Sequence, residues 1–164
     1  MSSYDRELAH LLRTNQIEEF NSLRPQEKER GAEVNLSRID LSNKSLANAN
    51  LNKIVLRNAN FSGANLIDTL LKGADLADAV FDGALMIGTN LSEAHVSGVD
   101  FTKAGFISGI NIWGMCSLNQ GQQSFLFEKI KESWNSHSGN KRPAHISVSL
   151  AKLLRERFKN CTQN

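Results

Sequence analysis

The sequence of 164 residues is 40% hydrophobic and has a formal net charge of +2, so it holds enough apolar material for one domain-sized core. No uninterrupted apolar run approaches the roughly 18 residues of a membrane-spanning helix, and the charged N-terminus lacks an apolar signal segment, which predicts a chain with no membrane span. The two cysteines, Cys116 and Cys161, show no metal-ligand or redox spacing, so a cytoplasmic location is the expectation.

The first predicted element is an amphipathic helix from Tyr4 to Leu23, which Pro25 ends. Its apolar side chains fall close to one face: Leu8, Leu11, Leu12, Phe20 and Leu23. The open backbone edge of a repeat structure invites pairing with other chains, and terminal caps are the usual protection. We therefore predict that residues 1–33 cap the N-terminal end of the segment that follows.

A large apolar residue recurs at every fifth position from Leu36 to Phe106 without a miss. The series is Leu36, Leu41, Leu46, Leu51, Leu56, Phe61, Leu66, Leu71, Leu76, Phe81, Met86, Leu91, Val96, Phe101 and Phe106. A small or apolar residue, often Ala, stands two positions before most of them. A period of five fits neither a helix of 3.6 residues per turn nor a strand of period two, so it indicates a repeat architecture.

The repeated units resemble the A-(D/N)-L-X-X signature of pentapeptide-repeat proteins. Examples are Ala-Asn-Leu-Asn-Lys (49–53), Ala-Asn-Phe-Ser-Gly (59–63) and Ala-Asp-Leu-Ala-Asp (74–78). The resemblance implies an all-β solenoid: a right-handed quadrilateral β-helix over residues 34–117, with four units in each coil of twenty residues. In such stacked coils each residue lies over the one twenty positions later. This geometry predicts one buried column of Phe61, Phe81 and Phe101.

The segment after the repeat is predicted to form a C-terminal cap, residues 118–164. Its apolar pattern leaves residues 123–127 open between a strand and the start of a helix that reaches Trp134. Residues 135–143 are predicted to form a polar loop, and residues 147–158 a helix with an apolar face of Leu150, Leu153, Leu154 and Phe158. More weakly, this tail resembles that of some bacterial pentapeptide proteins through Ile112-Trp113-Gly114, Gln120–Phe127 and Ile146–Phe158, which supports a cap.

No group of side chains has the spacing of a catalytic or metal site. The four histidines, His10, His95, His137 and His145, are not at metal-ligand spacing on one element. The Asn and Asp residues of the repeat are typical partners of turn backbone, and a regular rod offers no cleft to shift the pKa of a carboxylate pair. The recurring glycines Gly63, Gly73, Gly83, Gly88 and Gly98 mark corners rather than a phosphate loop. We predict no catalytic residue, cofactor or metal.

One outward-facing position of the repeat is apolar where the other columns are mostly polar. Ile67, Ile87 and Ile107 are expected to stack there, with Leu70, Leu85 and Ile110 alongside. A contiguous exposed apolar patch usually marks an interaction surface. Three occupants fit this expectation: an unidentified protein, a second copy of the chain in a homodimer, or the chain's own tail from Phe125 to Phe158.

These observations predict a non-catalytic protein–protein interaction scaffold. The alternative comes from the resemblance, because its best-understood members imitate duplex DNA and protect type II topoisomerases such as gyrase from inhibitors. That mimicry requires a strongly acidic surface. Residues 34–110 carry six basic and seven acidic residues, a net charge of −1, which argues against it. Residues 111–164 carry a net charge of +5, which we interpret as a solvated surface rather than a nucleic-acid site.

Overall fold

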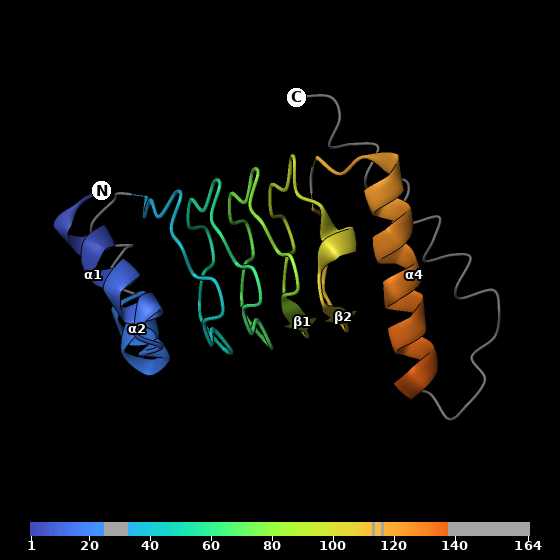
Figure 1. Ribbon diagram of the computed structural model, residues 1–164, viewed down its shortest axis with the longest axis horizontal. Helices are drawn as coiled ribbons and strands as arrows, with labels where there is room; N and C mark the ends of the chain where they lie inside the picture. The colour runs from blue at the N-terminus through green and yellow to red at the C-terminus, as the bar shows by residue number, and fades with distance from the viewer. Residues whose placement is uncertain (25–32, 113, 116, 138–164) are drawn as a thin grey trace.

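The computed structural model describes residues 1–24, 33–112, 114, 115 and 117–137, with side chains described as far as Glu132 (Figure 1). Helices α1 (Ser3–Arg13) and α2 (Ile17–Leu23) cover one end of a stack of coils. Helix α4 (Gln120–His137) lies across the other end. None of the helices in the described part of the chain is long and apolar enough to cross a membrane.

The N-terminal segment forms two helices instead of the single predicted one. A capping box between Ser2 and Asp5 starts α1, which ends at Arg13. Asn15 then takes a left-handed conformation with a φ of 58°, and this turn redirects the chain into α2. The prediction of one continuous helix was wrong. The apolar spacing continues across the short turn at Asn15, so the sequence pattern does not reveal the break between the two helices. The apolar residues of both helices, including Leu8, Leu12 and Phe20, are nevertheless fully buried.

Polar side chains of this segment occupy the open backbone edge of the first coil. The Asn21 side chain donates to the Asn48 carbonyl at 2.9 Å and accepts from the Asn50 amide at 2.8 Å. Arg24 donates to the carbonyls of Asn50 and Asn52. Burial lowers the pKa of Arg24 to about 10, so the guanidinium stays charged at neutral pH. The two helices therefore satisfy backbone groups that a further coil would otherwise pair.

Parallel bridges join residues twenty positions apart throughout the first three coils. Asn35 pairs with Val55, Val55 with Asp75, and Asp75 with His95. Most five-residue units close with the hydrogen bond of a β-turn, as in the 3.1 Å bond from the Ile39 amide to the Leu36 carbonyl. The last residue of most units has a positive φ, which type II turns require and which glycine adopts without strain. The predicted corner role of the repeated glycines is confirmed.

The inward residues form continuous columns, and the aromatic column predicted from the sequence is confirmed. The ring centroids of Phe61 and Phe81 lie 5.0 Å apart, and those of Phe81 and Phe101 lie 5.7 Å apart. All three side chains are buried. Thr69 and Thr89 also face inward, and each donates its hydroxyl to a carbonyl of the preceding coil rather than to the other threonine.

The five-residue register shifts by one in the last coil. Strand β1 (Leu85–Ile87) pairs in parallel with β2 (Phe106–Ser108), and the partners are twenty-one positions apart, as for Met86 and Ile107. The extra residue follows the short 3-10 helix η2 (Phe101–Lys103), where the amides of Gly105 and Phe106 both donate to the Ala84 carbonyl. The prediction of Phe106 as the last inward centre was wrong, because Ile107 takes that place.

Helix α4 closes the C-terminal end of the stack. Its Leu126 and Ile130 are buried, and Gln122 accepts from the Phe101 amide at 3.1 Å. Residues 123–127, left open from the sequence, are helical, and the loop predicted from residue 135 was wrong as far as 137 because the helix continues. The rest of that loop and the predicted helix 147–158 lie outside the described residues. The boundaries at 33/34 and 117/118 stay predictions.

Candidate interaction surface

The structure divides the six residues predicted as an apolar interaction surface into two groups. Ile67, Leu85 and Ile87 are half-buried on the outside of the coils, and Leu70 is exposed. Ile107 and Ile110 are each only 7% exposed, so the surface position predicted for them was wrong. The cause is the one-residue register shift, which turns both side chains inward. Whether the outward residues bind a partner stays a prediction.

The same shift brings out an aromatic residue that the sequence pattern had placed in the core. Phe106 is 54% exposed, and its backbone pairs directly with that of Leu85. We use the name apolar patch for the outward residues Ile67, Leu70, Leu85, Ile87 and Phe106. A signal for the shift was present in the sequence. Gly109 and Gly114 have positive φ values like the earlier corner glycines but stand one position later in the five-residue count.

Leu85 and Phe106 each stand directly before an inward-facing centre, Met86 and Ile107. We call this position the turn slot, and it is polar in most other units. Asn65 fills this slot one coil earlier, and its side-chain oxygen accepts a hydrogen bond from the Ile67 amide at 3.1 Å. The same contact, from the slot to the amide two residues on, recurs for Asn35, Asp40, Asn60, Asp75, Asn90 and Asp100. Leucine and phenylalanine have no side-chain acceptor for this hydrogen bond. The structure of the turn therefore does not explain why Leu85 and Phe106 fill the slot in two adjacent coils.

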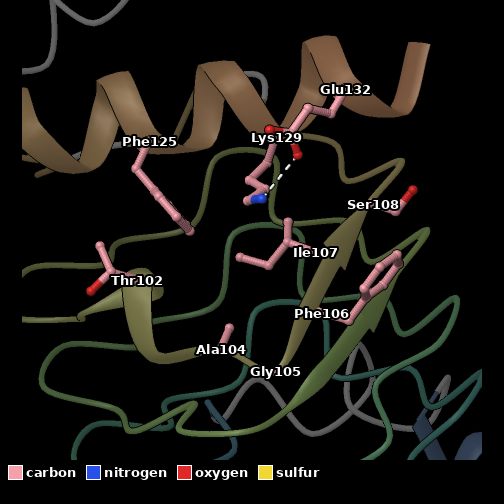
Figure 2. Close-up of a pocket in the computed structure, with 9 residues that line it drawn as sticks. All are labelled: Thr102, Ala104, Gly105, Phe106, Ile107, Ser108, Phe125, Lys129 and Glu132. Carbon is pink, nitrogen blue, oxygen red and sulfur yellow. Dashed lines mark hydrogen bonds and ion pairs between the residues drawn. The ribbon is translucent and has the colours of Figure 1, made fainter. Parts of the chain in front are cut away.

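A groove of about 460 Å³ lies beside the apolar patch, between the last coil and α4. Figure 2 shows Ile107 under the helix, near Phe125 and Lys129. Lys129 is held by Glu132 one turn further along, with a nitrogen–oxygen distance of 2.9 Å. The first part of the C-terminal segment thus covers Ile107, but it leaves more than half of Phe106 exposed.

Acidic residues flank the apolar patch on both sides. Asp82 is exposed at the corner before Leu85, three residues earlier in the chain. Asp68 is exposed at the opposite corner, and its Oδ1 lies so close to Gly88 that a Cβ added there would overlap it. The patch is therefore an apolar centre between two carboxylates, an arrangement that suits an apolar ligand with cationic edges.

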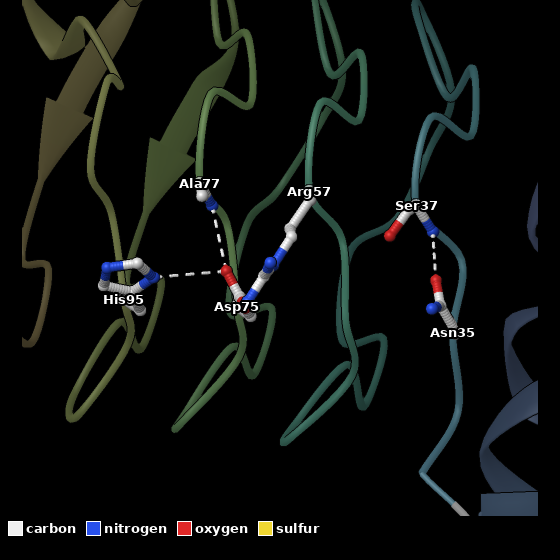
Figure 3. A network of polar contacts seen from close by, with 6 residues as sticks. All are labelled: Asn35, Ser37, Arg57, Asp75, Ala77 and His95. Carbon is white, nitrogen blue, oxygen red and sulfur yellow. Dashed lines mark hydrogen bonds and ion pairs between the residues drawn. The ribbon is translucent and has the colours of Figure 1, made fainter.

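Arg57, Asp75 and His95 form a column of polar contacts on another face of the stack (Figure 3), and its centre, Asp75, has a role in the turn. Asp75 accepts from Arg57 Nε at 2.6 Å and from the Ala77 amide at 3.2 Å, and it lies 3.3 Å from His95 Nδ1. Partial burial acts to raise the pKa of Asp75, but the hydrogen bonds from Arg57, Ala77 and His95 outweigh it and hold the pKa below its usual value. Asp75 fills the turn slot described above, as Asn35 does with Ser37.

This column shows no arrangement suited to catalysis or metal binding. The Arg57 side chain is 58% exposed and that of His95 is 45% exposed, so neither is desolvated as an activated catalytic group usually is. Within the described ranges of the chain, no three His, Cys, Asp or Glu side chains converge as metal ligands would. The geometry places the apolar patch, rather than this column, first among the candidate sites.

Comparison with known sequences identifies the five-residue units. A sequence profile of pentapeptide repeats, with eight copies, matches residues 35–73 and 64–102. No curated protein matches the chain.

Solved structures of pentapeptide repeat proteins are similar to the chain. One from the cyanobacterium Cyanothece 51142 is 27% identical, with 54% of this chain and 63% of that chain covered and a TM-score of 0.39. HetL of Nostoc sp. strain PCC 7120, involved in heterocyst differentiation regulation, is 27% identical over 51% of this chain and 40% of its own, with a TM-score of 0.35. A protein from the Arabidopsis thaliana thylakoid lumen is 29% identical over 70% and 87%, with a TM-score of 0.23. The chain spans less than two thirds of the length of the first two.

Proposed function

Because the chain belongs to the pentapeptide-repeat family, we propose that it is a non-catalytic scaffold that binds another protein through the apolar patch. The observation that carries this proposal is the direct pairing of Leu85 with the exposed Phe106. In this proposal residues 34–117 form a right-handed, quadrilateral β-helix between the caps 1–33 and 118–164. The rigid coils then hold the patch in one geometry before a partner arrives, which lowers the entropic cost of binding.

The size of the apolar patch suits a modest hydrophobic contact. Fully burying an apolar side chain of this kind contributes about 1.5–3 kcal/mol of transfer free energy. Ile67, Leu85 and Ile87 are already half-buried, so Phe106 has the most surface still to lose. Aromatic residues with apolar neighbours are typical centres of binding energy in protein interfaces. We therefore place Phe106 at the centre of the proposed contact.

The charge of the coils does not favour the alternative, a DNA mimic that protects gyrase. Such a surface needs regularly spaced anions, whereas Arg57 and Lys72 here pair with Asp75 and Glu93 across neighbouring coils. The absence of catalysis and a cytoplasmic location belong to the same proposal. They rest on the turn role of the repeat carboxylates and on the spacing of the two cysteines.

Affinity capture from the source cells, with the purified chain as bait, tests the proposal. The variants are Phe106→Asp in the apolar patch and Val80→Asp as the matched control, because Val80 is an exposed apolar residue in a unit outside the patch. A direct partner should be retained by the wild type and by Val80→Asp and lost at least tenfold with Phe106→Asp. The captured protein is then purified and titrated against the same three baits. Equal affinity for all three would refute the proposed surface.

A second variant separates a partner from self-association. Ile87→Asp should convert a homodimer held by the patch to a monomer with little loss of folding, which light scattering measures directly. If a different protein is the partner, the mass should stay unchanged and only the titrated affinity should fall. An unchanged mass together with an unchanged affinity would show that the apolar patch is ordinary surface.

A further inference from the structure

Asp82 and Lys103 occupy equivalent positions in two adjacent coils, at a corner beside the apolar patch. The Gly63 amide donates to the Asp82 carbonyl at 2.8 Å, and the Gly83 amide donates to the Lys103 carbonyl, also at 2.8 Å. Both charged side chains are exposed. Lys103 lies 3.8 Å from Asp100, and Asp82 has no ion-pair partner among the described residues. Side chains of opposite charge therefore follow one another from coil to coil on this corner.

The apolar residues of the patch follow the same two coils. Leu85 stands three positions after Asp82, and Phe106 stands three positions after Lys103. The two apolar residues pair directly between β1 and β2. Leu85 is half-buried and Phe106 is exposed. Each of the two coils thus presents one charged and one apolar side chain, and the sign of the charge changes from one coil to the next.

This pair of coils is complementary to itself under one two-fold rotation. An axis that crosses the face between the two coils, at right angles to the direction of stacking, exchanges the coils and keeps the corner in place. A second copy placed by this rotation has its Phe106 opposite Leu85. Its Lys103 lies opposite Asp82, and both contacts occur twice by symmetry. Apolar contacts at the centre with complementary charges at the rim are typical of specific protein interfaces.

The groove between the last coil and α4 extends this complementarity. Ile67 is half-buried on the outside of the coil before Leu85. The same rotation carries Ile67 of the second copy past the last coil, to the level of the groove that Phe106 and Lys129 line (Figure 2). The face is small, because its coils are only about 4.8 Å apart. Its contact area therefore falls in the class below about 1,200 Å² that is typical of weak complexes, which dissociate on dilution.

We propose that, when no other protein occupies the apolar patch, it binds a second copy of the chain in an antiparallel two-fold dimer centred between Leu85 and Phe106. The proposal rests on the proposed function in one respect, that the patch is a binding surface. It adds that a second copy and the external partner compete for this surface. Dimerisation then covers Phe106 until the partner displaces the second copy.

Charge reversal at the two corner residues tests this arrangement. Asp82→Lys places lysines at both corner positions, and Lys103→Asp places aspartates at both, so either variant alone sets like charges against each other across the two-fold axis. Sedimentation equilibrium should show each variant dimerising at least about tenfold more weakly than the wild type. An equimolar mixture of the two variants should recover dimerisation, because lysines of one copy then face aspartates of the other. Mixing cannot restore a loss of folding, so the recovery reports contact between copies.

Phe106→Asp examines the apolar centre of the dimer, with Val80→Asp as the control outside the patch. The first variant should stay monomeric at concentrations at which the wild type and Val80→Asp dimerise. A wild type that is monomeric at every concentration would overturn the proposal. A wild-type dimer whose two charge variants do not recover dimerisation on mixing would overturn it as well, because the copies would then be arranged differently.

The dimer and the proposed function can fail separately. Should the wild type be monomeric while Phe106→Asp still abolishes capture of a partner, only the self-association is wrong. Should the mixed charge variants recover dimerisation while capture is unaffected by Phe106→Asp, the external partner of the patch is wrong and the dimer stands.

Discussion

Leu85 and Phe106 lie side by side in adjacent coils although they are twenty-one positions apart in a chain whose other coils repeat every twenty. The extra residue moves Phe106 to the surface and Ile107 to the interior. One local insertion thus creates the most exposed aromatic of the described coils and, at the same step, fills the core beneath α4. The interaction surface and the C-terminal closure of the stack have a common origin.

The register shift predicts opposite outcomes for two neighbouring substitutions. Ile107→Ala should lower the free energy of unfolding by about 2–4 kcal/mol, because it leaves a cavity under α4. Phe106→Ala should change it by less than about 0.5 kcal/mol, since the ring is mostly in solvent. Urea denaturation of both variants measures the difference. A larger loss for Phe106→Ala than for Ile107→Ala would mean that the twenty-residue register continues into the last coil.

The stacked phenylalanine column predicts a large cost for removing its middle ring. Phe81 contacts aromatic rings on both sides, at centroid distances of 5.0 and 5.7 Å, and is 1% exposed. Phe81→Ala should lower the free energy of unfolding by about 3–5 kcal/mol. Thermal and urea unfolding provide the measurement, with Val80→Ala as the exposed neighbour. A shift no larger than that of Val80→Ala would contradict the column.

Gly105 is predicted to resist substitution at the site of the extra residue. A Cβ added there would lie 2.6 Å from the Gly83 carbonyl oxygen and 2.9 Å from its carbon, which are backbone atoms of the preceding coil. Gly105→Ala should therefore destabilise the fold by about 1–3 kcal/mol, as other overpacked sites do. Gly121→Ala is the control, because its Cβ would meet only Asn119 Oδ1 at 3.4 Å. That substitution in α4 should be neutral or stabilising by up to about 1 kcal/mol. Similar unfolding curves for the two variants would argue against the close approach.

The lowered pKa of Asp75 predicts an acid-dependent loss of stability. A carboxylate with a depressed pKa in the folded state stabilises the fold above its unfolded pKa of about 3.9, and this contribution disappears as the pH falls through the folded value. Asp75→Asn keeps an acceptor for the Ala77 amide but carries no titrating charge. Between pH 5 and 2, this variant should therefore lose less stability than the wild type does. The difference should be under about 1 kcal/mol, because solvent screens the charges at this partly exposed site. Arg57→Gln should also reduce the dependence, since it removes a partner of the carboxylate. Identical pH profiles for all three proteins would show that the column does not affect stability.

Local turn chemistry explains why so much of the coil structure could be predicted from the sequence. Most five-residue units carry their own turn, in which the last residue has a positive φ. That residue is often a glycine, asparagine or aspartate, which tolerate this conformation best, although Arg38, Lys53 and Glu93 adopt it too. The aromatic column then follows from the twenty-residue period, because Phe61, Phe81 and Phe101 are equally spaced. Both features depend on contacts within a unit or between identical positions of adjacent coils.

The ends of the stack depended on contacts that the five-residue pattern does not contain. At the last coil, Gln122 of α4 binds both the Phe101 amide and the Asp100 carboxylate, where the chain enters η2 and the register changes. At the first coil, Asn15 turns the chain so that Asn21 and Arg24 reach the open backbone edge. The unbroken spacing of apolar residues determined the coils by itself. The five-residue count put Phe106 inside, and only the pairing of the last two coils showed that Ile107 is buried in its place. The terminal helices were likewise beyond the repeat pattern, because an open edge must find its hydrogen-bond partners outside the repeat.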